Sequence, residues 1–443
     1  KTPDPLLRVP DFKIGKTGLE KAYESHLRGT AGRLEYEVNV AGRQLREVNR
    51  MDPVQGEQLT LTLDAELQKI MYERLSQEKS AAAVVLDVHT GEIYACASYP
   101  AFDPNDFSQG IEVNLWERLN NDRAYPLNNK AFGGQYPPGS TFKMMTAMAG
   151  LEAGVGPQRT VFCPGHFFLG NKKFHCWKPG GHGTVNVKDA IAHSCDTYFY
   201  KIATEIGIEK IAETSRKFGL GSEFGTDMPE EKGGLIPDQA WKRKRFPRDK
   251  KWHQGETVVN AIGQGYMLAT PLQLAVMTAR IVNGGKAIKP WFVAYENSKP
   301  TLPASFEDMK VRKQNLDIVK DGMVRVVMPG GTAAASQIQE EGWQMGGKTG
   351  TSQVKAITAS ERAAGSSYTQ ESLPWHLRHH ALFVGFAPRD NPRYATAVIV
   401  EHGIGGSKAA APIAKEILRE AQRLDVANRK PTPIPKAQEG EAG

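Results

Sequence analysis

The order of the predicted elements is the feature that most restricts how this 443-residue chain can fold. Alternating apolar residues predict an early hairpin around His89-Thr-Gly91 and a second hairpin around Arg389-Asp-Asn-Pro392. Helical patterns fill the middle of the chain and follow the second hairpin. The strands are expected at 81–88, 92–98, 381–387 and 394–401. Strands that gather in two places, with helices between and after them, predict an α+β fold rather than alternating βαβ units.

Helix boundaries follow from caps and glycine stops. The helices are expected at 65–79, 140–153, 187–206 (with Gly207 as the stop), 209–218, 270–282 and 407–421. Residues 1–59 contain two segments in which apolar and polar residues alternate, which predicts a small β-rich module and leaves 60–427 as the main domain. The polar stretch 358–380 is expected to be a flexible loop, and the Pro/Gly/Glu-rich tail 428–443 to be disordered.

The positive charge of the chain is concentrated in one segment, which is expected to be a loop (Lys242–Lys251). The chain has 56 Lys+Arg against 49 Asp+Glu, a net charge of +7, and Trp241–Trp252 holds seven of the basic residues and one acidic residue. Without this segment, 49 basic residues face 48 acidic ones. The run is either a solvated surface or a contact for an acidic polymer or an anionic membrane face. Nucleic acid is not expected as a partner, because the aromatic–glycine signatures of RNA-binding modules are missing.

The segment Pro137-Pro-Gly-Ser140-Thr-Phe-Lys143 is the strongest candidate for a nucleophilic site. Pro-Pro-Gly predicts a turn, and the apolar residues that follow predict a helix. Ser140 would then lie at a helix N-terminus, where free N–H groups favour a developing negative charge. Lys143 would lie one turn further on the same face, as a base for the hydroxyl.

Two further motifs follow in order. Ser194-Cys-Asp196 comes next, and Gly346-Gly-Lys348-Thr-Gly-Thr351 precedes an alternating segment. The single patterns are weak, since Ser76-Gln-Glu-Lys79 and Gly15-Lys-Thr-Gly18 repeat two of them without the context of a site. The ordered set S-x-x-K, S-x-[ND], K-T-G is far more specific, and it is the signature of penicillin-binding proteins and serine β-lactamases.

On these motifs the chain resembles the class B penicillin-binding proteins, most closely the elongation-type branch called penicillin-binding protein 2. Shorter matches extend over most of the chain: Leu27-Arg-Gly29, Gly42-Arg, Asp87 with Thr90-Gly91, Gly263-Gln-Gly265, Thr270-Pro-Leu-Gln-Leu-Ala275 and Phe383-Val-Gly-Phe-Ala-Pro388. The resemblance implies a transpeptidase domain over 60–427, with an antiparallel sheet packed against helices plus an all-helical part. Residues 1–59 would be the remnant of an N-terminal pedestal.

The resemblance also implies a peptidoglycan D,D-transpeptidase of cell-wall elongation. Ser140 would attack the D-Ala-D-Ala bond of a stem peptide, Lys143 would take its proton, Ser194 would relay a proton and Lys348 would orient Ser194. The substrate carboxylate would be bound by Thr349, Gly350 and Thr351, with the N–H groups of Ser140 and Thr351 as the oxyanion hole. β-Lactams would acylate Ser140 and remain attached.

Asp196 departs from the family pattern, in which many relatives have Asn at this position. An ionised Asp cannot donate a hydrogen bond, and a nearby carboxylate favours the charged form of a lysine. Asp196 is therefore expected to pair with Lys143 or to face Lys348.

Three of the four cysteines cluster around the middle motif. Cys163, Cys176, His182 and Cys195 would make a closed tetrahedral zinc site, with His166, His175 or His193 as substitutes for His182. One disulfide or free thiols are the alternatives. Cys96 is expected to be a core residue.

Other readings stay open within the same chemistry: a D,D-carboxypeptidase, or a relative that senses or hydrolyses β-lactams. A hydrolase needs a positioned glutamate, and no segment reads as that loop. The family further implies a RodA-type glycosyltransferase and an MreC-type scaffold as partners. It also implies a periplasmic catalytic domain held at the bacterial inner membrane by one N-terminal anchor, and the anchor is expected to be absent from this chain.

Overall fold

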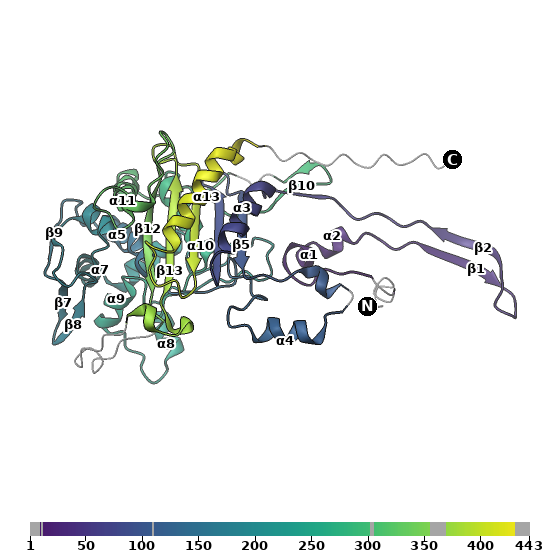
Figure 1. Cartoon of the computed structure of the whole chain (residues 1–443), viewed down its shortest axis with the longest axis horizontal. Helices are drawn as coiled ribbons and strands as arrows, with labels where there is room; N and C mark the ends of the chain where they lie inside the picture. Colours follow the sequence, from purple (N-terminus) through teal and green to yellow (C-terminus); the bar gives the residue numbers. More distant parts are fainter. Residues whose placement is uncertain (1–8, 10–11, 109, 302–304, 355–368, 430–443) are drawn as a thin grey trace.

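Five antiparallel strands form the central sheet, in the order β12–β13–β14–β4–β5 (Figure 1). The computed structural model describes residues 9, 12–108, 110–301, 305–354 and 369–429. The strands of this sheet are β4 (Ala81–Asp87), β5 (Ile93–Tyr99), β12 (Gly346–Ser352), β13 (His380–Ala387) and β14 (Tyr394–Val400). The two hairpins expected from the sequence are therefore confirmed, and β14 pairs with β4 to join them, with Val398 opposite Ala83.

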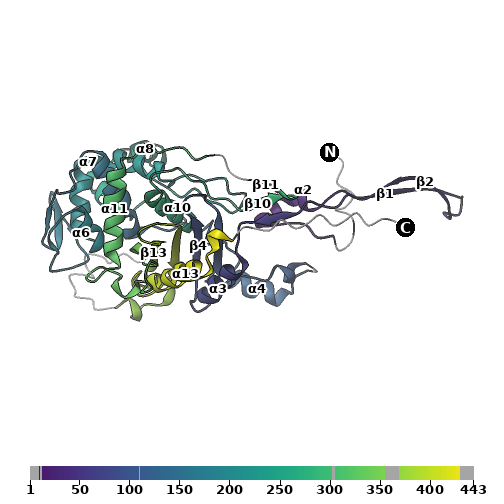
Figure 2. The same ribbon diagram turned by 90° about the horizontal axis from the view of Figure 1, so that it is seen from above.

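Helices cover both faces of this sheet. Contacts link α3 (Ala65–Leu75) to β5 and α13 (Ala410–Leu424) to β13 and β14, while α10 (Pro271–Val282) packs on β14 and β4. Figure 2 shows the sheet between α10 on one side and α13 on the other. Every residue of β4 and β14 is buried as a result. Strands covered on both faces read as continuous apolar runs, which explains their sequences.

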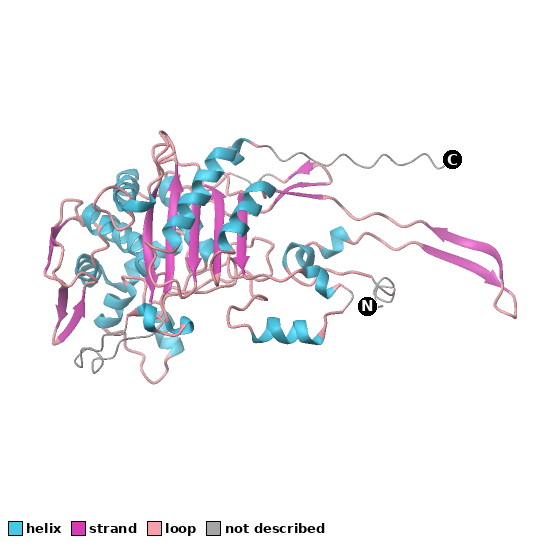
Figure 3. Cartoon of the chain, viewed as in Figure 1, coloured by secondary structure: helices cyan, strands magenta, loops and turns pink. Residues whose placement is uncertain are grey.

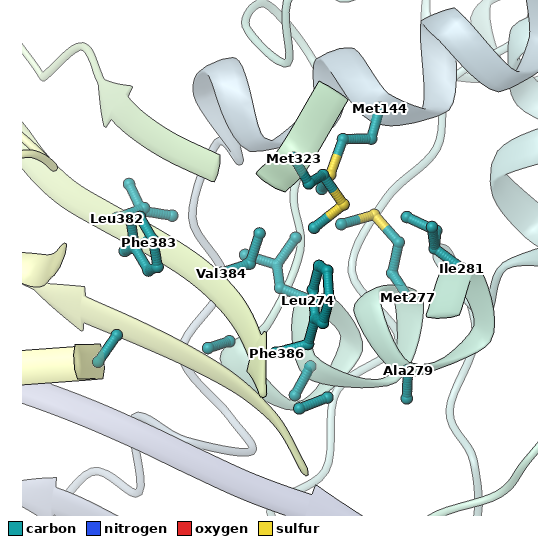
Figure 4. Packing of buried hydrophobic residues seen from close by; sticks show 14 of the residues in the cluster. Met144, Leu274, Met277, Ala279, Ile281, Met323, Leu382, Phe383, Val384 and Phe386 are labelled. Carbon is teal, nitrogen blue, oxygen red and sulfur yellow. The ribbon is translucent and has the colours of Figure 1, made fainter. Parts of the chain in front are cut away.

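A mainly helical part adjoins the β12 edge of the sheet, as Figure 3 shows. Its helix α5 (Lys143–Glu152) is buried along almost its entire length. The side chains of Met144, Met277 and Met323 point toward one another from three helices, near Phe386 of β13 (Figure 4). The helices of this part are α5 (Lys143–Glu152), α6 (Val187–Ala192), α7 (Asp196–Lys217), α8 (Gln239–Arg245), α9 (Gln254–Asn260) and α11 (Lys313–Val326). Two two-stranded sheets belong to it: β6 (Val161–Cys163) with β9 (Gly183–Val185), and between them in the chain the hairpin of β7 (His166–Leu169) and β8 (Lys172–His175).

The N-terminal module extends away from this body (Figures 1 and 2). Its hairpin packs so little against the rest that every residue of β2 is exposed. The elements are α1 (Gly18–Ala22), α2 (Glu24–Leu27), β1 (Arg33–Val38) and β2 (Gln44–Met51). A three-stranded sheet of β3 (Leu59–Leu61), β10 (Val293–Glu296) and β11 (Lys299–Pro300) follows, and α4 (Val113–Asn121) lies in a separate excursion. Among the described residues, no helix combines the length and apolar character needed to cross a membrane.

The α+β prediction is confirmed, but two local predictions are wrong. The helix expected over 187–206 is broken, because α6 ends at Ala192 and α7 begins at Asp196, and the left-handed backbone of Ser194 (φ 55°) separates them. The basic run that was expected as a loop is helical in its first part, α8. Residues 358–368 of the polar stretch 358–380 and the tail from residue 430 lie outside the described residues; the rest of the stretch contains two short 3-10 turns and leads into β13.

Candidate active site

Ser140 lies in a tight turn that leads into a buried helix. The segment Gly139–Phe142 forms a single 3-10 turn, and α5 continues from Lys143. Ser140 is half-buried, whereas Lys143 is fully buried one turn later. In the described part of the chain, no side chain forms a hydrogen bond with the Ser140 hydroxyl. This placement agrees with the helix N-terminus expected for Ser140.

The first and third motifs lie against each other through glycine. Gly139 has φ +54°, and a Cβ placed there would lie 2.4 Å from the carbonyl oxygen of Thr351. Gly263 approaches from the other side, since its carbonyl accepts a 2.9 Å hydrogen bond from the N–H of Gly139. Gln264 donates from Nε2 to the carbonyl of Thr351 at 3.0 Å. Three segments distant in sequence thus bring the backbone of Ser140 and that of Thr351 into one site.

Ser194 occupies the break between α6 and α7, where its hydroxyl lies between two buried lysines. Its Oγ lies 3.1 Å from Nζ of Lys143 and 3.0 Å from Nζ of Lys348. Its carbonyl oxygen also accepts from Lys143 at 2.9 Å. The left-handed backbone turns both oxygens toward the lysines, which a continuous helix would not do. The three polar residues therefore form one hydrogen-bonded path, Lys143–Ser194–Lys348.

Asp196 pairs with Lys143, one of the two lysines that it was expected to face. Oδ1 accepts from Nζ of Lys143 at 2.6 Å, and Oδ2 accepts from the N–H of Trp177 at 2.9 Å. Asp196 is itself buried as the first residue of α7. The pair therefore gives the buried Lys143 an opposite charge at hydrogen-bond distance and connects the middle motif to the loop that carries Trp177.

Lys348 is fully buried in β12, opposite Val384 of β13. Burial, reinforced by the nearby charge of Lys143, holds the pKa of its amine well below the usual range. Nζ also donates to the carbonyl of Thr349 at 3.0 Å. A buried amine that favours its neutral form, hydrogen-bonded to a serine hydroxyl, is able to accept a proton from it.

The remaining residues of the third motif line the same strand. The hydroxyl of Thr349 lies 3.0 Å from that of Thr332, and Gly350 is buried where a Cβ would meet Thr141 at 2.8 Å. Thr351 is half-buried at the turn of Gly139. Thr332 and Trp177 belong to no motif and were not predicted, and Gly263-Gln-Gly265 was noted in the sequence without its contact to Thr351.

The two repeated patterns lie away from this site. Ser76 ends α3, where its hydroxyl donates to the carbonyl of Glu73, and Lys79 lies over the ring of Trp375. The other pattern forms the start of α1, with Gly18 donating from its N–H to Glu230. Context rather than the bare pattern separates these segments from the site.

Four residues expected to hold a metal converge beside the middle motif. The ligand atoms of Cys163, Cys176, His182 and Cys195 all lie within 4.8 Å of one another. The three thiols are buried, and all four cysteines of the chain are free. A tetrahedral zinc with bonds of about 2.0–2.3 Å needs ligand atoms roughly 3.3–3.8 Å apart, so the spread fits with small adjustments.

The chemistry of this cluster also suits a cation. Nδ1 of His182 points at the sulfurs of Cys176 and Cys163, at 3.5 and 3.7 Å. The thiol of Cys195 lowers the pKa of Cys176 by hydrogen bonding, while that contact and burial raise the pKa of Cys195. Cys195 precedes Asp196 directly, so the cluster holds the start of α7 and the Trp177 loop together. Cys96, by contrast, lies in β5, where it is half-buried and packs against the core, and desolvation raises the pKa of its thiol to about 12.

Comparison with known proteins agrees with this geometry. The model of the penicillin-binding protein transpeptidase domain matches residues 81–419, and that of the penicillin-binding protein dimerisation domain matches residues 9–61. The domain boundaries expected from the sequence stay predictions. Peptidoglycan D,D-transpeptidase MrdA of Acinetobacter baumannii is 41% identical over 90% of this chain and 59% of its own length. MrdA of Escherichia coli K12 is 37% identical over 91% of this chain and 64% of its own length. The chain thus spans about three fifths of the length of these curated relatives.

Solved structures show the same likeness. The complex between penicillin-binding protein PBP2 and MreC from Helicobacter pylori contains a chain with a TM-score of 0.81 and 35% identity, over 93% of this chain and 72% of that one. Pseudomonas aeruginosa PBP2 in complex with WCK 5153 has a TM-score of 0.78 and 37% identity, over 97% of this chain and 87% of that one. With the fold, the three ordered motifs and these matches in agreement, the chain belongs to the penicillin-binding protein transpeptidase family, in its PBP2 branch.

Proposed function

We propose that the chain is the catalytic part of a peptidoglycan D,D-transpeptidase that crosslinks stem peptides through a serine acyl-enzyme. The observation that carries this proposal is the Ser194 hydroxyl between Nζ of Lys143 and Nζ of Lys348, at 3.1 and 3.0 Å, next to the helix turn of Ser140. Relatives of 36–41% identity that are named peptidoglycan D,D-transpeptidases support it. Acyl transfer is the chemistry for which a serine, two buried amines and backbone N–H groups are suited.

The reaction follows from the roles of these groups. Oγ of Ser140 attacks the carbonyl carbon of the D-Ala-D-Ala amide and passes its proton to the hydrogen-bonded amines, first to Lys143. The C–N bond then breaks, and the departing D-alanine takes up a proton through Ser194. An amine of a second stem peptide attacks the ester carbonyl, forms the new amide and returns the proton to Ser140.

The two lysines have different roles in this proton transfer. Asp196 forms an ion pair with Lys143, while burial favours the neutral form of Lys348. The path through Ser194 lets a proton on Lys143 move toward Lys348, so that Lys143 regains a lone pair for Ser140. The N–H groups of Ser140 and Thr351 would bind the oxyanion, and each such donor contributes about 3–4 kcal/mol to the transition state. Thr349, Gly350 and Thr351 would hold the substrate carboxylate.

Labelling with penicillin tests this function. The purified chain is incubated with a labelled penicillin, and the mass of its peptides locates the label. We expect a stable adduct on Ser140 that Ser140→Ala abolishes and that Ser76→Ala, which removes the serine of the repeated pattern, leaves unchanged. Label elsewhere would sink the proposal. Release of the label within seconds would make the protein a β-lactam hydrolase.

A second assay separates crosslinking from trimming. With a stem pentapeptide and an acceptor amine present, a transpeptidase forms a peptide-linked dimer, whereas a D,D-carboxypeptidase only releases D-alanine. A product without any dimer at high acceptor concentration would favour the carboxypeptidase.

We further propose that the protein works at the outer face of the inner membrane, in the periplasm, with partners of the RodA and MreC types. Solved relatives support this: one is a complex of PBP2 with MreC, and another is described as a peptidoglycan synthase complex that coordinates polymerization and crosslinking. Binding of this chain to a purified MreC-type domain, measured by calorimetry, tests the scaffold. Absence of any heat at protein concentrations far above those needed for PBP2 and MreC would count against it.

We also propose a structural zinc ion held by Cys163, Cys176, His182 and Cys195. Bound zinc would hold the segments of this loop-rich region together, and it would take part in no step of acyl transfer. Its consequence for the site is positional, because Cys195 precedes Asp196 and Cys176 precedes Trp177. Elemental analysis should find about one zinc per chain, lost in Cys163→Ser and kept in Cys96→Ser. No zinc in the untreated protein, or three readily alkylated thiols, would contradict the proposal.

A further inference from the structure

One segment, joined to the active site through Tyr266, carries a set of cations that form no ion pair with any described residue. Six exposed side chains between the middle of α8 and the start of α9 make up this set, which we term the cationic rim: Arg243, Lys244, Arg245, Arg248, Lys250 and Lys251. Within the part of the chain that the structure describes, no carboxylate forms an ion pair with any of them. The residues that the structure describes therefore leave this charge without a carboxylate partner.

Asp249, within the basic segment, and Glu256, at the start of α9, already have ion-pair or hydrogen-bond partners. Lys242 is buried, and its Nζ contacts Glu256 at 2.6 Å and Asp249 at 3.2 Å. Glu256 also accepts from the N–H of His253 at 2.7 Å, and Asp249 lies 3.5 Å from Nε2 of His253. These contacts pin the segment at its buried lysine and leave the six other cations facing solvent.

Aromatic packing fixes the rim to the wall of the site. The rings of Trp241, Phe246 and Tyr266 pack mutually, with centroids 5.0–5.7 Å apart. Tyr266 directly follows the Gly263–Gly265 turn, which contacts Gly139 and, through Gln264, the carbonyl of Thr351. The aromatic cluster and the Gly263–Gly265 turn therefore connect the rim to Gly139, the residue before Ser140. In Figure 1, α8 and α9 lie at the lower edge of the molecule.

A neighbouring hairpin adds to the same positive region. Phe174 of β8 packs with Tyr200 of α7 and Val258 of α9, which places the β7–β8 hairpin against α9. Its exposed Lys172 and Lys173 carry two more charges. The segment 241–252 alone holds 7 − 1 = +6 of the net +7 of the chain. Almost all the excess positive charge thus lies on the side of the molecule that carries α9.

We propose that the cationic rim binds the free carboxylates of uncrosslinked peptidoglycan strands and guides them to the active site, an inference that rests on the proposed function. Stem peptides end in a carboxylate and carry others along the chain, so a glycan strand that bears many of them is a polyanion. Unpaired lysines and arginines at the mouth of a site raise the local concentration of an anionic substrate. The contacts to Gly139 and Thr351 favour a substrate over an anionic membrane surface, because a membrane contact needs no link to the catalytic backbone.

Equilibrium binding tests this inference without turnover. Ser140→Ala prevents acylation, and soluble glycan strands with stem pentapeptides serve as the ligand. In this background the six rim residues are changed to Gln, with Lys242 kept. The matched control neutralises six exposed cations elsewhere that form no ion pair with described residues: Lys13, Lys16, Arg43, Lys289, Lys299 and Lys313. Penicillin acylation of each variant without Ser140→Ala reports whether its site is folded.

We expect the rim variant to bind strands at least tenfold more weakly at low ionic strength, and the control to change by less than about twofold. The difference should vanish near 1 M salt, where the screening length is about 3 Å. Strands whose carboxylates are converted to amides should bind both proteins equally. Unchanged strand binding in a folded rim variant would overturn the inference. So would loss of binding to anionic phosphatidylglycerol vesicles alone, which would assign the rim to a membrane. Failure of penicillin to label Ser140 would refute the proposed function, while strand binding would still report on the rim.

Discussion

The substitution Gly139→Ala tests whether the approach of two backbones sets the rate of acylation. The added Cβ would lie 2.4 Å from the carbonyl oxygen of Thr351, and real contacts of Cβ are essentially never below 3.0 Å. The two segments must therefore separate by at least 3.0 − 2.4 = 0.6 Å. A left-handed alanine adds a backbone cost of about 1–2 kcal/mol.

The consequence for chemistry follows from the donors of the oxyanion hole. In the proposed mechanism one of these N–H groups is that of Ser140 and the other that of Thr351, so separation of the two segments would move one donor away from the oxyanion. A displacement of about 1 Å costs on the order of 100-fold in rate. We expect the second-order rate constant of penicillin acylation to fall by roughly 10- to 100-fold, measured by stopped flow with a fluorescent penicillin.

Gly154→Ala is the matched control. Gly154 also has positive φ (+93°), but a Cβ there would meet no heavy atom within 4 Å. The control therefore has the backbone strain without the collision, and urea unfolding of both variants measures that shared strain. Equal acylation rates for Gly139→Ala and the wild type, or an equal loss in both variants, would refute the steric reasoning.

Three further changes probe the buried charges. Asp196→Ala should lower the free energy of unfolding by about 3–5 kcal/mol, because it leaves Lys143 buried without its counter-charge. A loss of less than about 1 kcal/mol in a urea titration would contradict the pairing. Lys348→Met should keep or raise the free energy of unfolding, because burial disfavours the charged amine. It should nevertheless slow penicillin acylation by about 10²-fold or more. Acylation at the wild-type rate would rule out a role for this amine in proton transfer. The third change concerns His380, whose pKa burial lowers from 6.5 to about 3. The unfolded chain therefore binds the proton first, and stability should fall as the pH drops from about 6.5 toward 3, by at most ~1.4 kcal/mol per pH unit. His380→Gln, which keeps an acceptor for the N–H of His402, should flatten that dependence, and identical slopes in the two proteins would exclude His380 as the source.

Features that depend on neighbours in the sequence could be predicted. Both hairpins of the central sheet follow from alternating or continuous apolar runs around turn residues, and α10 follows from its capping box at Thr270. The turn before Ser140 was likewise readable from Pro-Pro-Gly. The 14-residue helix α11 was missed, although its buried residues Leu316, Val319 and Met323 recur at the i, i+3, i+7 spacing of an amphipathic helix.

The sequence by itself determined the chemistry of this protein: an ordered serine–lysine, serine–aspartate and lysine–threonine–glycine set, a cysteine cluster and one concentrated basic segment. It did not determine how these groups meet. Only the tertiary structure decided that the helix breaks at Ser194, that Asp196 pairs with Lys143 rather than Lys348, and that Gly139 touches Thr351. The physical reason is that residue types and caps are local, whereas burial, which shifts the pKa of Lys348, and the approach of distant backbones depend on how the helices pack against the sheet.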